Sequence, residues 1–289
     1  MATDRLEIEK QPKLRDGRLI LAFSGWMNGG DVSTGTVEWL IKTLSAERVA
    51  NIGPEGFYIY NFPGSMEISA LFRPYADITD GQLVTYRLPR NRFFCCPQHQ
   101  LLLFRGREPN LNWEDFADCI LTFASQAGAS SLYFVGSVGG TVPHTREPRL
   151  ITAVSDSKLK PMLEQYGVRF TNYEGPASFS THLLAHAGQY GLHMASLVAE
   201  IPAYIQGANP KSIEAVLKTL LTLLGVQADL AELRALSGAW EERVNNALSE
   251  KPELAEYIQK LEEDYDNEVF DTQMGELKAW LEQQGIRVD

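Results

Sequence analysis

Apolar and polar residues fall in blocks along the chain that predict buried strands and amphipathic helices. Short apolar runs predict strands at residues 19–23, 57–62, 83–88, 92–96, 101–104, 131–135, 150–154 and 192–201. Apolar residues spaced three and four apart predict helices that begin near Asp31 or Ser33, and at residues 113–123, 158–166, 179–189 and 210–224. Because strands alternate with helices, the fold class is α/β, with a mainly parallel sheet and helices on both faces.

The last 64 residues carry a different pattern. Three apolar stripes at helical spacing start at Leu230, Leu254 and Met274, and Gly285 closes the third. We therefore divide the chain into an α/β domain at residues 17–225 and a helical segment at residues 226–289. The apolar faces of the helices need a partner, either their own domain or another subunit.

The net charge of −11 is concentrated in the helical segment. Residues 227–289 hold 16 acidic and 6 basic side chains, whereas the rest of the chain holds 21 and 20. An acidic segment repels nucleic acids and anionic lipids, so we expect neither as a partner. No run of 18 apolar residues is present and residues 1–15 do not form a signal peptide, so we expect no membrane span and a cytoplasmic protein.

The cysteines and histidines give no strong site. Three cysteines cannot form a disulfide framework, and two of them are adjacent, so we expect reduced thiols. His182 and His186 are four residues apart on a predicted helix, which suits either a metal or two structural histidines. Since that helix has no acidic residue and the HExxH motif is absent, we expect no metal. Neither the GxGxxG nor the GxxxxGK(S/T) nucleotide motif occurs, so we expect no other cofactor.

Two glycine-rich turns, each after a buried strand, are the candidate binding elements. Residues 25–31 follow the first predicted strand, and residues 136–141 follow the strand at 131–135. In parallel sheets ligands bind beyond the carboxyl ends of the strands, where glycine lets the backbone approach. Asp31 suits a helix N-cap better than a catalytic acid. Arg146, shortly after the second turn, could hold an anion or pair with a carboxylate such as Glu147.

Four stretches together point to a known family. They are residues 22–30; residues 139–141 with Thr145 and Arg146; residues 173–176; and residues 197–204 followed by Asn209 and Pro210. In order and spacing they resemble the proteasome assembly chaperone 2 family, whose prokaryotic members are often labelled "ATP-grasp superfamily". The resemblance covers residues 17–225. It implies a three-layer α/β/α fold similar to nucleoside phosphorylases, and frequently a homotrimer. Ser180 stands where phosphorylases usually carry an acidic residue.

Two functions remain open on these observations. The first is a non-enzymatic assembly or scaffold protein, a homo-oligomer with a trimer favoured, which holds a protein partner. The second is a protein that binds a nucleoside-like or anionic small molecule, or a hydrolase-like or phosphorylase-like enzyme. Its pocket would comprise Gly25, Trp26, Asp31, Gly139, Gly140, Arg146, Glu174 and Gly175. Glu174 is the candidate acid or base, because burial at a strand-end turn would raise the pKa of its carboxyl. No nucleophile and base can be paired from their spacing, so the first function is favoured.

Overall fold

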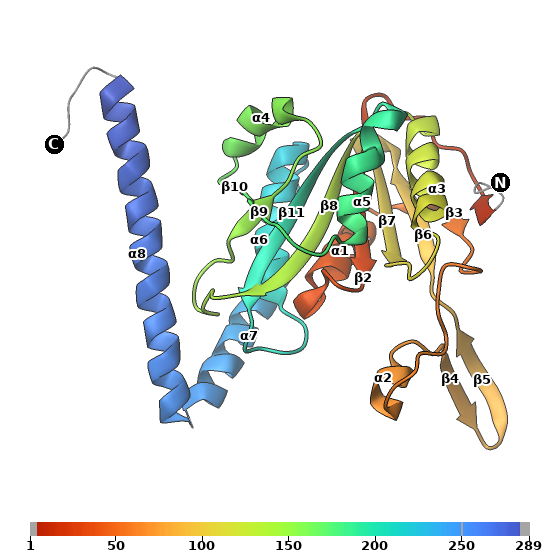
Figure 1. Ribbon diagram of the computed structural model, residues 1–289, viewed down its shortest axis with the longest axis horizontal. Helices are drawn as coiled ribbons and strands as arrows, with labels where there is room; N and C mark the ends of the chain where they lie inside the picture. The colour runs from red at the N-terminus through yellow and green to blue at the C-terminus, as the bar shows by residue number, and fades with distance from the viewer. Residues whose placement is uncertain (1–4, 250, 284–289) are drawn as a thin grey trace.

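A nine-stranded sheet forms the centre of the molecule (Figure 1). The computed structural model describes residues 5–249 and 251–283. The strands lie in the order β1-β3-β6-β7-β2-β8-β11-β9-β10. Their bounds are β1 Leu6–Ile8, β2 Gly17–Ser24, β3 Glu47–Ile52, β6 Asn91–Cys96, β7 Leu101–Arg107, β8 Ala129–Gly140, β9 Leu150–Thr152, β10 Arg169–Phe170 and β11 His193–Pro202.

The four strands in the middle of this sheet run parallel. β2 pairs with β7 on one side and with β8 on the other, and β8 pairs with β11 along its length. β1, β3 and β6 extend the sheet antiparallel on one flank, and β9 pairs antiparallel with β11 on the other. The middle parts of the central strands, such as Leu19–Phe23 of β2, are apolar and buried because both of their faces are covered.

Helices cover both faces of the sheet. On one face α3 (Trp113–Gln126) and α5 (Phe179–His186) pack with Phe104 and Phe134 into an aromatic core. On the other face α1 (Val32–Thr43) and α6 (Pro210–Leu224) pack on the opposite side chains of β2, β8 and β11. The short α4 (Lys160–Glu164) lies near β10. The predicted α/β class and its three layers are confirmed.

Two predictions of local structure were wrong. Residues 57–62 form no strand, because Phe57 and Tyr58 are buried from a loop: the Phe57 ring meets that of Phe116 edge-on at 4.8 Å, and the Tyr58 hydroxyl donates to Asn91 Oδ1 at 2.8 Å. Residues 136–140 form no turn, because β8 continues through them in pairing with residues 198–202 of β11.

The C-terminal helices number two in the described part of the chain rather than three. α7 (Ala231–Ser249) packs on α6, and its Leu233 and Trp240 are buried. The second and third predicted stripes lie on one helix of 32 residues, α8 (Pro252–Gln283). Figure 1 shows α8 standing beside the body. The predicted stop at Gly285 lies outside the described residues. No described helix combines the length and the apolar character needed to cross a bilayer.

An arm, residues 61–90, projects from the opposite side of the molecule (Figure 1). It consists of α2 (Met66–Ala70) and a hairpin of β4 (Tyr75–Thr79) and β5 (Gln82–Arg87), which form a separate two-stranded sheet. The predicted strand at residues 83–88 therefore exists as β5, but it pairs only with β4. The Nη2 atom of Arg107 donates to the Leu71 carbonyl at 2.8 Å and ties the arm to the body.

Candidate functional site

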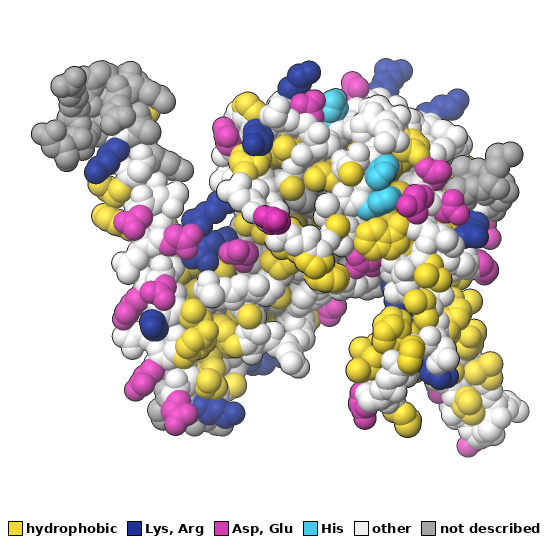
Figure 2. All heavy atoms as spheres, in the orientation of Figure 1, with side chains coloured by type: hydrophobic (Ala, Val, Ile, Leu, Met, Phe, Trp, Pro, Cys, Tyr) yellow, Lys and Arg dark blue, Asp and Glu magenta, His cyan; other side chains and the backbone are white. Residues whose placement is uncertain are grey.

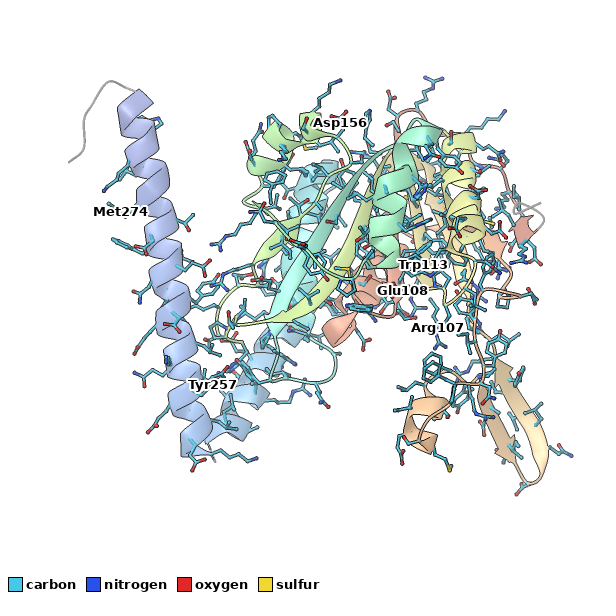
Figure 3. All side chains as sticks on the ribbon, viewed as in Figure 1. Arg107, Glu108, Trp113, Asp156, Tyr257 and Met274 are labelled. Atoms are coloured by element: carbon cyan, nitrogen blue, oxygen red, sulfur yellow. The ribbon has the colours of Figure 1, made fainter. Side chains whose placement is uncertain are left out.

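A carboxylate joins the first glycine turn to the start of α5. Glu108 follows the end of β7, and its Oε2 accepts from the Trp26 amide at 2.8 Å. Its Oε1 accepts from the amide of Phe179, the first residue of α5, at 3.0 Å. Figure 3 shows Glu108 beside Arg107 and Trp113, where the body meets the arm. The carboxylate thus satisfies two backbone donors that would otherwise lack partners.

Gly25 is required by this arrangement. Its φ is +154°, a conformation that other residues rarely adopt, and an added Cβ would lie 2.6 Å from the Cβ of Glu108. Gly25 therefore lets the turn close over the Glu108 side chain.

Asn28, rather than Asp31, caps α1 with its side chain. Asp31 occupies the N-cap position, as the sequence predicts, but its φ is +55° and its side chain makes no cap hydrogen bond. The Oδ1 of Asn28 accepts from the Thr34 amide at 3.0 Å instead. Ser137 of β8 locks the turn, because its amide donates to the Met27 carbonyl and its hydroxyl to the Gly29 carbonyl. A rigid turn therefore places Trp26 and Met27 beyond the sheet edge.

A cavity of about 440 Å³ lies beside this turn. Its walls come from the first glycine turn, from β8, β9 and β11, from the loop at residues 171–178, and from α5. The volume is within the range of small-molecule sites. The apolar lining residues are Trp26, Met27, Val138, Ile151, Ala153, Pro176, Leu184 and Val198.

Apart from the amide of Asn172 and an indole N–H, the polar side-chain groups in the wall of this cavity are hydroxyls, and most of them are already hydrogen-bonded. The Thr152 hydroxyl donates to the Ser196 carbonyl at 2.6 Å, and the Ser196 hydroxyl accepts from the Ala153 amide at 2.9 Å. The Ser178 and Ser180 hydroxyls lie 2.7 Å apart and bond to each other. None of the residues that line the cavity carries a charged side chain.

The predicted site residues reach different parts of the molecule. Trp26 lines the cavity, and Gly25 lies directly before it. Glu174 and Gly175 belong to an exposed loop in which Tyr173 and Pro176 line the same cavity. The burial expected for Glu174 was wrong, because its side chain lies on the surface of this loop. The other four positions are not part of its lining: Asp31 precedes α1, Gly139 and Gly140 lie at the end of β8, and Arg146 lies in the loop after β8.

Arg146 holds a carboxylate of the chain itself. Its Nε and Nη2 atoms donate to the two carboxylate oxygens of Asp266 in α8, each at 2.8 Å. Glu262 lies 3.7 Å from Nη1. The hydrogen bonds from Arg146 lower the pKa of the Asp266 carboxyl, and the same pairing raises the pKa of Arg146. Of the two roles open for Arg146, the structure contains the carboxylate pair, although the partner is not Glu147.

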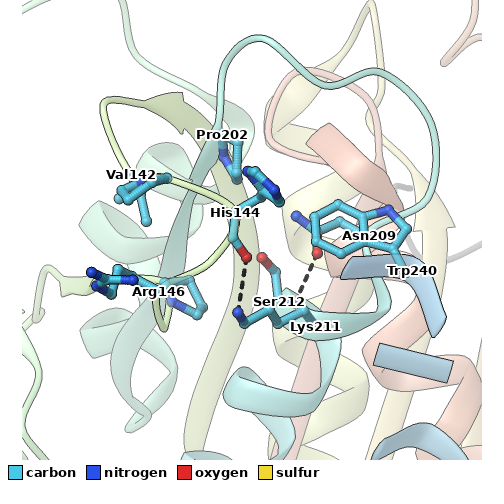
Figure 4. Close-up of a pocket in the computed structure, with 10 residues that line it drawn as sticks. Val142, His144, Arg146, Pro202, Asn209, Lys211, Ser212 and Trp240 are labelled. Carbon is cyan, nitrogen blue, oxygen red and sulfur yellow. Dashed lines mark hydrogen bonds between the residues drawn. The ribbon is translucent and has the colours of Figure 1, made fainter. Parts of the chain in front are cut away.

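A second, much smaller cavity lies where α7 contacts the loop at residues 141–149 (Figure 4). Its volume of about 10 Å³ has room for no more than one water molecule. His144, in its wall, is 2 % exposed, and its ring nitrogens lie 2.8 Å from the Tyr204 hydroxyl and 3.0 Å from Asn245 Oδ1. Lys211 Nζ donates to the His144 carbonyl at 2.8 Å and pairs with Glu241 at 2.6 Å. Burial lowers the pKa of His144 and so disfavours the protonated imidazole at this junction.

The paired histidines pack against each other rather than form a cluster of ligands. The rings of His182 and His186 have centroids 4.2 Å apart, and the Nδ1 of His186 bonds the His182 carbonyl. The described residues contain no group of three or more His, Cys, Asp or Glu side chains placed to hold a metal. The three cysteines are buried thiols, and burial raises the pKa of Cys95 and Cys119 to about 11, so neither is a thiolate near neutral pH.

Comparison with known families identifies the chain. The sequence profile of the PAC2 family matches residues 22–248, which is well over half of the chain. The chain belongs to the PAC2 family. The match extends through most of α7 and leaves out α8. The predicted division at residue 225 stays a prediction. A comparison with curated proteins found no match.

Solved structures resemble this PAC2 protein over most of its length. The Mycobacterium tuberculosis proteasome-assembly chaperone homologue Rv2125 is 27 % identical, with a TM-score of 0.72, over 83 % of this chain and 99 % of the other. A PAC2 family protein from Streptomyces avermitilis is 28 % identical, also with a TM-score of 0.72, over 84 % and 99 %. The Mycobacterium tuberculosis unknown function protein Rv2714 has a TM-score of 0.81 over 94 % and 92 %, and at 20 % identity it shows the shared fold alone.

Glu108 is the residue of this region that the sequence pattern missed. It follows an apolar strand, as the first glycine turn does. The sequence there, Gly106-Arg107-Glu108-Pro109, has a single glycine and is not a glycine-rich turn. The usable signal was its place directly after a buried parallel strand, where carboxylates reach the N-termini of neighbouring helices.

Proposed function

We propose that this PAC2 protein is a non-enzymatic assembly protein that works as a homo-oligomer, with a trimer favoured, and holds a protein partner in the cytoplasm. Family membership and the likeness to the chaperone homologue Rv2125 support the assembly role. A cysteine content that cannot form a disulfide framework supports a reducing compartment. The observation that carries the proposal is the exposed apolar surface of the arm.

The arm exposes large apolar side chains on all of its parts (Figure 2). Met66 in α2 is 86 % exposed and Leu71 just after it is 71 % exposed, while Ile78 and Leu83 of the hairpin are 65 % and 61 % exposed. Further exposed residues of the arm are Phe62, Ile68, Tyr75, Val84 and Tyr86. Contiguous apolar patches of this kind mark protein–protein contacts.

The arm also lacks a core of its own. A two-stranded hairpin is marginally stable in water without a surface to pack on. The described residues of the arm include no buried apolar side chain. The rings of Phe62 and Phe72 stack on each other, but neither ring is buried. Packing against another copy of the chain would cover these side chains, and closed symmetry is the common way for identical chains to do this.

Native mass spectrometry of the purified chain tests the proposal. We expect a mass three times that of the 32.3 kDa protomer. Ile78 and Leu83 lie opposite each other in the hairpin, so Ile78→Asp with Leu83→Asp should shift the population to monomers. The matched control is Thr79→Asp with Gln82→Asp, which adds the same two charges at the neighbouring opposed pair and should keep the oligomer. A wild-type monomer at micromolar concentration would contradict the proposal.

A second candidate function, binding of a small molecule, is favoured by the cavity of about 440 Å³ at the strand ends. In this case the chain would be a ligand-binding protein or a hydrolase-like or phosphorylase-like enzyme, with Glu174 as its candidate acid or base. Glu174 lies in the loop that borders the cavity. An enzyme would show turnover of a nucleoside by the purified chain, and Glu174→Gln would abolish it without a change in the melting temperature.

A further inference from the structure

The cavity of about 440 Å³ beside the first glycine turn has an uncharged lining, and this restricts the kind of ligand it can hold. Its lining contains no Lys, Arg, Asp, Glu or His. Of the carboxylates that flank lining elements, Glu174 lies in the exposed loop next to Tyr173, and Glu108 is occupied by the amides of Trp26 and Phe179. Arg146, the predicted anion clamp, lies outside the lining and is paired with Asp266 and Glu262. A buried charge without a partner is strongly disfavoured, so this lining disfavours ligands whose charge would be buried in the cavity.

Aromatic side chains stand at its mouth. Trp26 is 68 % exposed and Tyr173 is 65 % exposed, and both line the cavity. They come from two different segments, the first glycine turn and the loop at residues 171–178. The hydroxyl of Tyr173 donates to the Pro176 carbonyl at 3.0 Å, which fixes the ring in place. Exposed aromatic rings at the rim of an apolar cavity favour flat, ring-bearing ligands, because rings stack on one another.

Polar groups for a neutral ligand are present next to these rings. Among the described residues, none accepts or donates a hydrogen bond to the side chains of Thr171 and Asn172, and both line the cavity. An amide and a hydroxyl offer donors and acceptors without charge. The apolar wall, formed by Ile151, Leu184 and Val198, would enclose the body of the ligand.

We propose that this cavity binds an uncharged, ring-bearing small molecule of nucleoside size, whose ring lies between Trp26 and the apolar wall. The inference rests on the second candidate function and sharpens it, because the sequence left both a nucleoside-like and an anionic ligand open. The uncharged lining favours an uncharged ligand, and the aromatic rings of Trp26 and Tyr173 at the mouth favour a ligand that contains a ring.

Titration calorimetry of the full chain tests this with matched probes. The uncharged panel is adenosine, guanosine, uridine and indole, and the charged panel is AMP, GMP, UMP and inorganic phosphate. We expect saturable binding of at least one uncharged compound, and at least tenfold weaker binding of its phosphorylated partner. Trp26→Ala should weaken that binding about fivefold, the size of a lost stacking contact. Trp280→Ala removes another exposed tryptophan, on α8, and should leave the affinity unchanged.

A cavity-filling variant locates the site. Thr181 is exposed and lines the cavity, so Thr181→Trp should fill it without disturbing the core and should abolish binding at an unchanged melting temperature. If AMP or phosphate binds more tightly than every uncharged compound, the inference is overturned while small-molecule binding survives. If neither panel binds below millimolar concentration, both the inference and the second candidate function are overturned. Binding that Trp26→Ala and Thr181→Trp leave intact also overturns the inference.

Discussion

Glu108 shows how one side chain can assemble the edge of this sheet. Its two oxygens accept from amides that belong to the first glycine turn and to the first turn of α5. Both hydrogen bonds involve a charged acceptor, which makes them stronger than bonds between neutral groups. The carboxylate also faces the N-terminus of α5, where the helix dipole favours negative charge.

Replacing this carboxylate should therefore cost stability. We expect Glu108→Ala to lower the free energy of unfolding by about 2–4 kcal/mol, because two amides lose a charged acceptor. Urea denaturation measures the change. Glu38→Ala, which removes an exposed carboxylate 3.3 Å from Arg105, should change stability by about 0.5 kcal/mol or less. A loss at Glu108 no greater than at Glu38 would show that the bridge is not structural.

His182, unlike Glu108, makes the stability of the fold depend on pH. Its Nε2 atom is buried without a hydrogen-bond partner among the described residues, and its ring stacks on that of Phe179 with the centroids 6.0 Å apart. Burial, followed by the neighbouring His186, lowers the pKa of His182, whereas Glu114 opposes the shift. Because the folded-state pKa is depressed, the unfolded chain binds the proton more readily. Stability is therefore full above the unfolded pKa of about 6.5 and falls as the pH drops through the folded value.

The variant His182→Phe keeps the ring and removes the titration. We expect it to be equal to the wild type or up to about 1 kcal/mol more stable at pH 8, because the unsatisfied nitrogen is gone. Between pH 7 and pH 5 its melting temperature should fall less than that of the wild type. Calorimetry across this pH range measures the difference. Parallel melting curves for the two proteins would mean that His182 does not titrate in this window.

At the scale of elements, α8 is attached to the body mainly through charge. Arg149 pairs with Glu268 and with Glu200, and Arg169 also pairs with Glu268. The aromatic ring of Tyr265 lies under the Arg149 guanidinium at 4.5 Å. Apolar burial is limited to Ile258 and Leu261 among the described side chains of the helix. The Arg149 side chain is largely buried, but the carboxylates of Asp266 and Glu268 are about half exposed, and ion pairs that reach the solvent are weakened by salt.

Salt should therefore loosen α8 selectively. Hydrogen exchange of the amides in residues 258–270 should be several-fold faster in 1 M than in 0.1 M sodium chloride, while exchange in the central strands stays unchanged. Asp266→Asn with Glu268→Gln should produce the same increase at low salt. The matched control, Asp264→Asn with Asp271→Asn, removes two exposed acids of the same helix and should have little effect. Equal exchange in both double variants would rule out the ion pairs as the attachment.

At the scale of the whole molecule, the arm and α8 lie on opposite sides of the sheet (Figure 1). The arm contacts the body near β6 and β7, and α8 contacts the loop after β8 and the strand β10. If the arm carries the oligomer, α8 is not needed for it. The acidic residues of the C-terminal segment then act within one protomer, because their carboxylates pair with Arg146, Arg149 and Arg169 of the same chain.

Truncation after Ser249 separates these roles. The shortened chain should remain folded, with a melting temperature lower by roughly 10 °C, because it loses the burial of two apolar side chains and several ion pairs. It should keep the same number of protomers as the full chain in native mass spectrometry. A monomeric truncation product with a cooperative melting transition would assign the oligomer contact to α8 instead of the arm.

Local signals were sufficient for the elements whose side chains face one core. Trp113, Phe116, Ile120 and Phe123 predicted α3 because all four lie on one helix face, and Asn209 with Pro210 predicted the start of α6. β3 was missed, although it pairs with both β1 and β6, because its mixture of exposed and buried residues resembles a loop. Of the predicted site residues, Trp26 lines the cavity, whereas Arg146 forms an ion pair with Asp266 of α8.

The sequence by itself determined the α/β class, the family and the acidic, helical C-terminal segment. These follow from periodicity, charge and short motifs, which act between residues close in the chain. Only the tertiary structure decided that β5 belongs to an exposed arm, that Glu108 bridges the glycine turn and α5, and that Arg146 faces Asp266 rather than a ligand. Each of these depends on which distant segments meet, and the same apolar run or charged side chain fits several partners until the fold brings one of them within a few ångströms.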